Sequence, residues 1–265
     1  MSGRGAGASV PVETGESRWK TRGRAAWDRV REGALELISP TRCASCERPG
    51  ELICSRCLEE TGFIDPAEAC ARCGAPFGRL LCTECQGQPA ALDRCLATAV
   101  FDGPPARIVR AYKDAGERRL ARQIAELMAD TARHAEERDP ARYAGIVSRA
   151  DAVVFVPATA AAYRRRGFDH MELVARELCA VTGLAFADAL AKCGRSDQRE
   201  LSRDERFASS QDVYVVVAPE LVRGRRVLLI DDVVTTGATL AAAAHALRAA
   251  GAKSVDGLAF ARVWG

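Results

Sequence analysis

The sequence has 265 residues, 48% hydrophobic and 28% charged, which is enough apolar material for one sizeable core and a smaller second unit. Its 38 basic and 35 acidic side chains leave a formal charge of only +3, so bulk charge gives no argument for nucleic-acid binding. No apolar stretch approaches the roughly 20 residues that cross a bilayer, and the start lacks the apolar core of a secretory signal. We therefore expect a cytoplasmic protein without a membrane span.

The region before the first cysteine divides into two parts. Residues 1–18 are rich in Gly, Ser and Ala and are expected to form a disordered tail. Residues 19–42 carry Trp27, Val30, Ala34 and Leu37 at helical spacing, which predicts a short amphipathic helix and a lead-in to the next region.

Eight of the eleven cysteines fall between residues 43 and 85, in four CxxC pairs that read CASC, CSRC, CARC and CTEC. Two thiolates separated by two residues can turn toward one metal ion, and two such pairs complete the four-cysteine shell that zinc prefers. A disulfide framework is the alternative, but it suits secreted proteins better. The pattern predicts a double zinc ribbon over residues 43–90.

The intervals between the CxxC pairs make consecutive pairing the simplest arrangement, although interleaved pairing stays open. Both sites would be closed four-thiolate shells, which makes the two zinc ions structural rather than catalytic. The predicted ligands of the first ion are Cys43, Cys46, Cys54 and Cys57, and those of the second are Cys70, Cys73, Cys82 and Cys85.

Residues 91–265 then show an alternation of strand and helix patterns. LATAVF at 96–101 predicts a strand, DGPP a turn in which proline opens a helix, and ARIVRAY that helix. Gly116 interrupts the pattern. An apolar stripe from Leu120 to Thr131 predicts a second helix, which the charged HAEERDP should end.

The rest of this region predicts a parallel α/β sheet. Strands are expected at AVVFVP, RRVLLID and SVDGLAFAR, and one helix through Leu240 and Leu247. A further helix should cover about residues 169–182, with Asp169 and Glu172 as a capping box and Gly183 at its end.

Two acids, Asp231 and Asp232, follow the apolar run VLLI, and the loop TTGAT comes directly after them. Ligands of such sheets bind at the carboxyl ends of the strands. A loop with hydroxyls and free amides at a helix N-terminus suits a phosphate monoester, whereas carboxylates suit sugar hydroxyls. Capping of the next helix is the alternative for one acid. Together, the acids and the loop indicate a ribose 5-phosphate group.

The stretch VLLIDDVVTTGAT resembles the phosphoribosyl pyrophosphate (PRPP) signature of type I phosphoribosyltransferases. Together with the cysteine-rich region, VFVP and RRRGFDH, it makes the chain similar to the ComF family, also called the GntX group, over residues 27–262. In that family, Asn and Gln stand where this chain has Asp169 and His170. A later pattern that resembles the mobile flap matches at Gln198, Leu201, Ser202 and Arg206.

The resemblance implies a site for PRPP. Asp231 and Asp232 would hold the ribose hydroxyls, and the 5-phosphate would lie on Thr235, Thr236, Gly237, Ala238 and Thr239. Lys113 matches a lysine stretch of ComF proteins, and an exposed helical lysine is the alternative. Type I enzymes often have a non-proline cis peptide near the pyrophosphate, which we look for at Pro157-Ala158.

Pyrophosphate needs cations, because charge develops on it as it leaves. Arg164, Arg165 and Arg166 follow the strand that ends at Pro157, and Arg166 is the best candidate for that role, with a catalytic part beside Asp231 and Asp232. For Arg164 and Arg165 a solvated basic turn is equally plausible. His170 is the histidine nearest to these residues, but a weak candidate for a base.

Two functions are open at this point. The first is an enzyme that transfers phosphoribosyl from PRPP, with Mg²⁺, to an unidentified nitrogen nucleophile, linked through its family to competence and DNA uptake. The second is a PRPP sensor or adaptor whose zinc ribbons bind single-stranded DNA or protein partners. Only Phe63 and Phe77 lie among the eight cysteines, which gives little for base stacking. The acceptor and the oligomeric state are not predicted.

Overall fold

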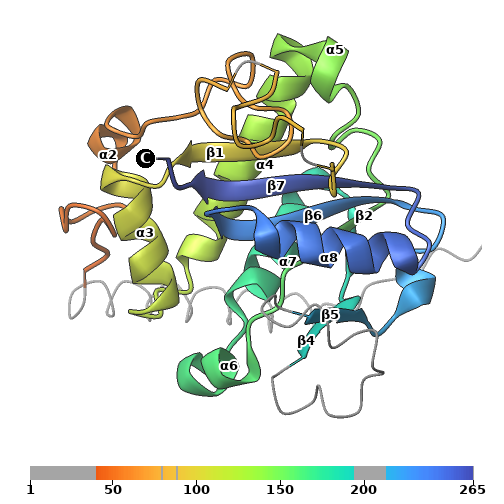
Figure 1. Ribbon diagram of the computed structural model, residues 1–265. Coiled ribbons are helices and arrows are strands. Elements are labelled where there is room, and N and C mark those ends of the chain that lie inside the picture. The colour runs from red at the N-terminus through yellow and green to blue at the C-terminus, as the bar shows by residue number, and fades with distance from the viewer. Residues whose placement is uncertain (1–39, 79, 88, 194–212, 265) are drawn as a thin grey trace, which may run out of the picture.

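The computed structural model describes residues 40–78, 80–87, 89–193 and 213–264. In these residues the main feature is a five-stranded parallel sheet (Figure 1). Its strands, in spatial order, are β1 (Cys95–Val100), β7 (Ser254–Arg262), β6 (Arg226–Val234), β2 (Ala152–Phe155) and β3 (Ala185–Ala187). The predicted parallel α/β sheet is confirmed.

Helices cover both faces of this sheet. On one face lie α3 (Gly103–Lys113), α4 (Leu120–Arg138) and α7 (His170–Thr182), and on the other lies α8 (Ala238–Ala249). Figure 1 shows α8 in front of the sheet and α4 and α7 behind it. Because side chains alternate along a strand, Leu228 and Ile230 of β6 join the first core, and Val227 and Leu229 the second. The central strands are therefore apolar on both faces.

The ends of the helices follow local sequence signals. Two prolines open α3. Asp169 caps α7, since its Oδ1 accepts from the amides of Met171 (2.9 Å) and Glu172 (3.3 Å), and Gly183 ends the helix with φ of 78°. Glu172 does not complete the predicted box, because its carboxylate accepts from Arg176 instead.

Helix α4 ends within the charged segment HAEERDP, as predicted. The helix continues through HAEER and ends at Arg138, before Asp139 and Pro140. Its charged residues occupy the solvent side, while Ala132 and Ala135 extend the buried stripe. Charge alone therefore does not end this helix, whereas proline prevents its continuation.

Strand β6 is longer than predicted and contains both acids. It pairs with β7 up to Val234, but its other neighbour, β2, stops at Phe155, which lies opposite Ile230. Asp231 and Asp232 therefore lie beyond the end of β2, at the carboxyl edge of the sheet.

The cysteine-rich segment packs along the edge strand β1 (Figure 1). The amide of Ile64 donates to Thr98 (3.0 Å), and the amide of Cys95 donates to Ala71 (2.8 Å). Arg142, in the short helix α5 (Pro140–Tyr143), donates to the carbonyls of residues 66, 67 and 69. Helix α2 (Ser55–Glu59) lies within this segment. The segment thus covers an edge that would otherwise expose unpaired backbone groups.

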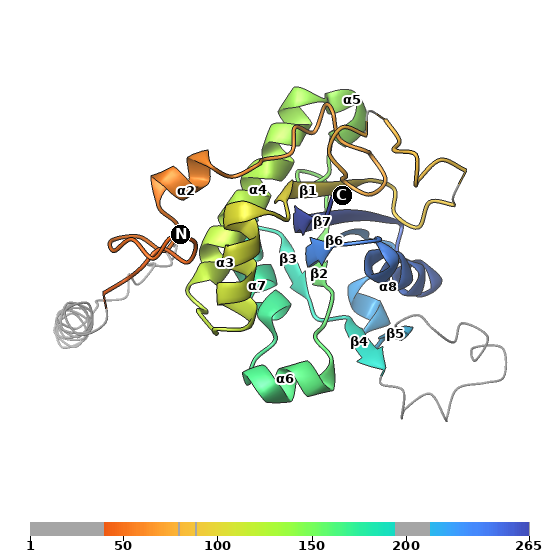
Figure 2. The same ribbon diagram turned by 60° about the vertical axis from the view of Figure 1, so that its left-hand side comes forward.

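A separate antiparallel pair, β4 (Leu190–Cys193) and β5 (Val213–Val216), lies beside α8 (Figure 2). Helix α6 (Ala160–Arg166) follows β2, and a 3-10 turn, Pro219–Leu221, precedes β6. The predicted tail, the helix through Trp27 and the flap pattern at 198–206 lie outside the described residues. No helix within the described part of the chain is long and apolar enough to span a membrane.

Candidate functional site

A chain of polar contacts is centred on Asp232. Its Oδ2 lies 2.5 Å from Lys113 Nζ and 2.6 Å from His170 Nε2, and its Oδ1 accepts from the amide of Val233 at 2.6 Å. His170 Nδ1 in turn lies 3.2 Å from Arg166 Nη1. Because arginine only donates, Nδ1 accepts, and the imidazole proton belongs on Nε2, which faces the carboxylate.

Three helices bring these groups to the end of β6. Lys113 is the last residue of α3, Arg166 the last of α6, and His170 the first of α7. The buried Tyr112 hydroxyl donates to the backbone carbonyl of His170, which fixes the start of α7 against α3. The site is therefore assembled from segments far apart in the sequence.

The two acids have opposite electrostatic environments. Burial opposes ionisation of Asp232, but the hydrogen bond from His170 and the charge of Lys113 outweigh it and hold its pKa below the ordinary value. Burial and the negative charge of Asp232 raise the pKa of Asp231 well above its ordinary value. The Asp231 Oδ1 accepts from the amide of Asp232 at 2.9 Å. The pair therefore favours a single negative charge in the unliganded protein.

A cavity of about 440 Å³ opens beside Lys113. We call it the cationic cavity; it is lined by Lys113, Asp114, Ala115, Gly116, Arg165, Arg166 and Phe168. The guanidinium of Arg118 lies 4.3 Å from the centre of the Phe168 ring, which adds a further cation nearby. This concentration of positive charge fits a polyanionic group such as pyrophosphate.

The predicted arginines do not all reach this cavity. Arg166, which is partly buried, lines it, and so does the exposed Arg165. Arg164 is exposed and does not line it. The helical turn of α6 separates the directions of these three consecutive side chains, which the sequence run alone does not reveal.

The bond between Pro157 and Ala158, where we looked for a cis peptide, is trans, and no cis bond occurs among the described residues. The Ala158 amide donates instead to Asp169 Oδ2 at 2.7 Å. Asp169 thus binds this loop with one oxygen and caps α7 with the other. The Ala158 amide is therefore paired with the Asp169 carboxylate within the protein.

The loop from Thr235 to Thr239, here called the threonine loop, joins β6 to α8. Gly237 is the N-cap of α8 with φ of 80°, and Thr236 Oγ1 accepts from the amide of Ala238 at 3.3 Å. Thr235, Thr236 and Ala238 are exposed. The loop therefore presents accessible amides at the positive end of a helix, an arrangement that suits a phosphate group.

Sequence reasoning gave too little weight to Asp169 and His170. Both are positions where this chain departs from the ComF pattern, and that departure was the available signal. Their roles depend on contacts with Ala158 and Asp232, which no local pattern shows.

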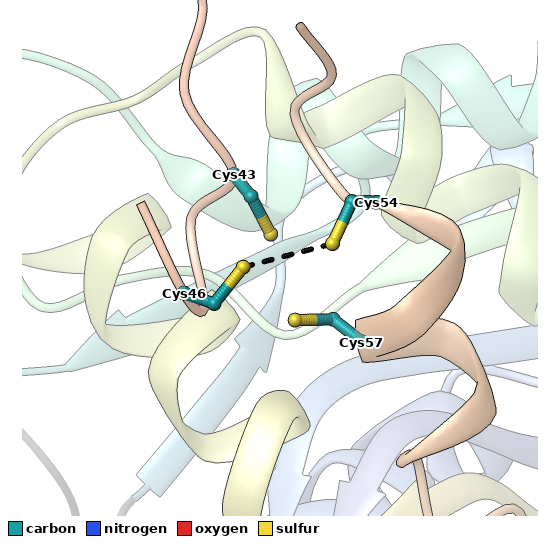
Figure 3. A group of neighbouring side chains, drawn as sticks. All are labelled: Cys43, Cys46, Cys54 and Cys57. Carbon is teal, nitrogen blue, oxygen red and sulfur yellow. Dashed lines mark hydrogen bonds between the residues drawn. The ribbon is translucent and has the colours of Figure 1, made fainter. Parts of the chain in front are cut away.

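The eight clustered cysteines form two groups with consecutive pairing, and within each group the sulfurs lie within 4.8 Å of one another. The first quartet is Cys43, Cys46, Cys54 and Cys57, and the second is Cys70, Cys73, Cys82 and Cys85. Figure 3 shows the four sulfurs of the first quartet turned toward a common centre.

The spacing of the sulfurs fits zinc. The Sγ atoms of Cys46 and Cys54 are 3.6 Å apart, and those of Cys73 and Cys82 are 3.7 Å apart. Four sulfurs at about 2.3 Å from a tetrahedral zinc ion would be roughly 3.8 Å apart. None of the eight forms a disulfide. The hydrogen bond between Cys70 and Cys73 lowers the pKa of the Cys70 thiol and raises that of Cys73, so the metal-free pair favours one thiolate.

Comparison with known proteins agrees with this arrangement. The family model described as phosphoribosyl transferase domain matches residues 119–262. The chain is 28% identical over 228 residues to DNA utilization protein YhgH of Salmonella typhi, covering 83% of this chain and 96% of that protein. It is 24% identical over 235 residues to competence protein F of Haemophilus influenzae, covering 84% and 95%. The chain belongs to the ComF family of phosphoribosyltransferase-like proteins.

This ComF-family chain also has weak similarity to two solved structures. The allosteric regulatory enzyme of purine biosynthesis is 22% identical, with a TM-score of 0.36 and 52% of this chain covered. The glutamine PRPP amidotransferase of B. subtilis, complexed with ADP and GMP, is 22% identical, with a TM-score of 0.36 and 53% covered. The matched parts span only 25% and 26% of those chains.

Proposed function

We propose that this protein binds PRPP at the carboxyl edge of β6 and transfers its phosphoribosyl group to a nitrogen nucleophile, releasing pyrophosphate. One observation carries the proposal. The acid pair, Asp231 and Asp232, lies at the end of β6 between the threonine loop, which follows in the chain, and the residues of the cationic cavity, of which Lys113 contacts Asp232. PRPP carries its phosphate, ribose and pyrophosphate in that same order.

The hydrogen-bonding capacity of the acids suggests how the ribose binds. A carboxylate oxygen accepts about two hydrogen bonds, so Lys113 and His170 fill Oδ2 of Asp232. Among the described residues, Oδ2 of Asp231 has no hydrogen-bond donor. Asp231 would therefore accept from one ribose hydroxyl, and the remaining capacity of Asp232 Oδ1 from the other. Asp232 also orients Lys113 toward the pyrophosphate side.

Binding to the acids would hold the anomeric carbon between nucleophile and leaving group. The nitrogen lone pair forms the new bond to that carbon, and the bond to the pyrophosphate oxygen breaks with its electron pair. The nitrogen then gives its proton to pyrophosphate or to water. Lys113 and Arg166 would stabilise the charge that develops on pyrophosphate. Carboxylate oxygens are ligands that Mg²⁺ prefers, and Mg²⁺ bound with PRPP would further neutralise the charge of the phosphates.

Binding and turnover can be tested separately. Calorimetric titration with PRPP and Mg²⁺ should show saturable binding, and a panel of amines and bases should contain one that stimulates pyrophosphate release. Absence of PRPP binding would contradict the proposal as a whole. Binding without stimulated release by any nucleophile would contradict the transferase part.

The second candidate is a PRPP-responsive adaptor for DNA uptake that does not turn over. The names of the relatives, DNA utilization protein and competence protein F, favour such a link. So do Phe77 and Leu80 of the cysteine-rich segment, which are 78% and 69% exposed. These two exposed apolar side chains of one segment are available for contact with a protein partner or single-stranded DNA. Binding of a labelled oligonucleotide that Phe77→Ala abolishes, without stimulated pyrophosphate release, would favour this function.

A further inference from the structure

A buried arginine connects the second quartet to the threonine loop. Arg262, the last residue of β7, is 3% exposed. Its Nη1 donates to the carbonyls of Val234, Thr235 and Val263. Its Nη2 lies 3.9 Å from Cys73 Sγ and 3.7 Å from Glu84 Oε2. One guanidinium therefore contacts both a cysteine of the second quartet and the start of the loop.

These contacts set the direction of the loop amides. In a trans peptide the carbonyl and the following N–H point in opposite directions. The Val234 carbonyl accepts from Arg262 and also from the amide of Val263 at 2.9 Å, whereas the Thr235 carbonyl accepts from Arg262. Because both carbonyls point toward Arg262, the amides of Thr235 and Thr236 point away from it. An anion bound on the far side of the loop would meet those two N–H groups.

Few other contacts hold the loop in this state. Within the described part of the chain, no group other than Arg262 from outside β6, α8 and the loop itself hydrogen-bonds to Thr235, Thr236 or Gly237. A cavity of about 250 Å³ lies between the loop and the second quartet, lined on its two sides by Thr236 and Gly237 and by Cys73 and Cys85. Arg262 also lines it. The conformation of the loop thus depends on the arginine more than on packing.

The charge of the second quartet explains why a cation is buried there. A divalent zinc ion with four thiolates carries two net negative charges, which a neighbouring guanidinium offsets. A buried charge without such a partner is costly. Loading of the second quartet would therefore hold Arg262 in place, and Arg262 would hold the loop.

We propose that Arg262 is a positioning residue that couples zinc occupancy of the second quartet to phosphate binding by the threonine loop. The proposal rests on the proposed phosphate site for its effect on affinity, but the coupling itself does not. The first quartet lacks this connection: side-chain hydrogen bonds tie its segment to α3 and to the start of α4, where Arg107 donates to Ser45 (3.0 Å) and Arg119 to Thr41 (3.1 Å).

The first test compares Arg262→Gln with the wild type. Ribose 5-phosphate affinity should fall about tenfold or more, and pyrophosphate affinity by less than about twofold, because only the loop amides lose their orientation. Arg262→Lys, which can still donate to a carbonyl, should recover part of the loss. Arg94→Gln breaks the partly buried ion pair between Arg94 and Asp256 of β7, and controls for general destabilisation. Equal losses for both ligands in Arg262→Gln would overturn the proposal.

The second test removes one quartet at a time and does not depend on ligand binding. The wild type should contain about two zinc ions per chain and each of Cys73→Ser and Cys54→Ser about one. Hydrogen exchange of the amides at 235–239 should accelerate in Cys73→Ser and in Arg262→Gln, but not in Cys54→Ser. Identical loop exchange in the two cysteine variants would overturn the coupling. A wild type that binds no phosphate compound would instead overturn the proposed function, and loop exchange would still decide the coupling.

Discussion

The two flanks of the acid pair are built in different ways. On one flank, Lys113, Arg166 and His170 come from three helices and act through charged or polar side chains. On the other, the threonine loop offers backbone amides at the start of α8 and is largely exposed. Ligand binding at the cationic flank should thus depend on side-chain identity, and ligand binding at the loop flank on backbone conformation.

The largest expected effect comes from the acids between the flanks. Changing both Asp231 and Asp232 to Asn should weaken PRPP and ribose 5-phosphate binding by about 100-fold or more, because the negative charge of the pair, which strengthens its hydrogen bonds from the ribose hydroxyls, is lost. Free pyrophosphate should bind about as well as to the wild type, since reduced repulsion offsets the lost orientation of Lys113. The melting temperature should change little. The substitution removes the buried carboxyl of Asp231, whose ionisation is unfavourable, and this gain offsets the loss of the ion pair between Lys113 and Asp232.

Calorimetry with the three ligands and a thermal melt of the same variant measure this. The exposed Asp151→Asn, whose partner is Arg226, is the control and should leave all three affinities unchanged. Unchanged PRPP affinity, or a large loss of stability with affinity retained, would show that the acids serve the fold instead.

The next largest effect comes from a change on the cationic flank. Arg166→Ala should reduce pyrophosphate and PRPP affinity about tenfold or more, and ribose 5-phosphate affinity only slightly, because a charge-assisted contact to the leaving group is lost. The exposed Arg133→Ala in α4 provides a matched control. If Arg166→Ala weakened both ligands equally, the guanidinium would not belong to the pyrophosphate flank.

The corresponding experiment on the loop flank changes Gly237. Gly237 has φ of 80° with space around its Cα, so Gly237→Ala introduces backbone strain of about 1 kcal/mol and little steric clash. Ribose 5-phosphate affinity should fall by about fivefold and pyrophosphate affinity should not change. Gly224→Ala, also at positive φ (71°) and in open space, carries the same strain far from the site. Equal binding by both glycine variants would refute the dependence on loop conformation.

The smallest effect concerns stability alone. Because the folded pKa of Asp231 is raised, its stabilising contribution is fully present below the ordinary value of about 3.9 and is lost as pH rises through the folded pKa. The melting temperature of Asp231→Asn relative to that of the wild type should therefore rise by about 2–4 °C between pH 4 and neutrality.

Melts at several pH values check this prediction. Arg226 lowers the pKa of Asp151 through a hydrogen bond, so Asp151→Asn should shift in the opposite direction, losing stability relative to the wild type above pH 4. A difference between Asp231→Asn and wild type that stays constant with pH would contradict the raised pKa.

Much of the fold was predictable because its signals are local. The CxxC spacing predicted the two cysteine quartets, since each pair closes within four residues and consecutive pairing is the shortest closure. The apolar runs predicted β6 and β7, and Asp169 and Gly183 marked the ends of α7. The acids and the threonine loop were recognisable because they are contiguous in the chain.

Only the tertiary structure decided which distant groups meet. The contacts of Lys113 and His170 with Asp232, and of Arg262 with Cys73 and the threonine loop, join residues 27 to 189 positions apart. Local spacing contains no information about such pairs, because the packing of helices on a twisted sheet sets their distances. For the same reason the sequence indicated a basic turn at 164–166, but only the turn of α6 and the packing around it decided that Arg165 and Arg166 line the cavity while Arg164 does not.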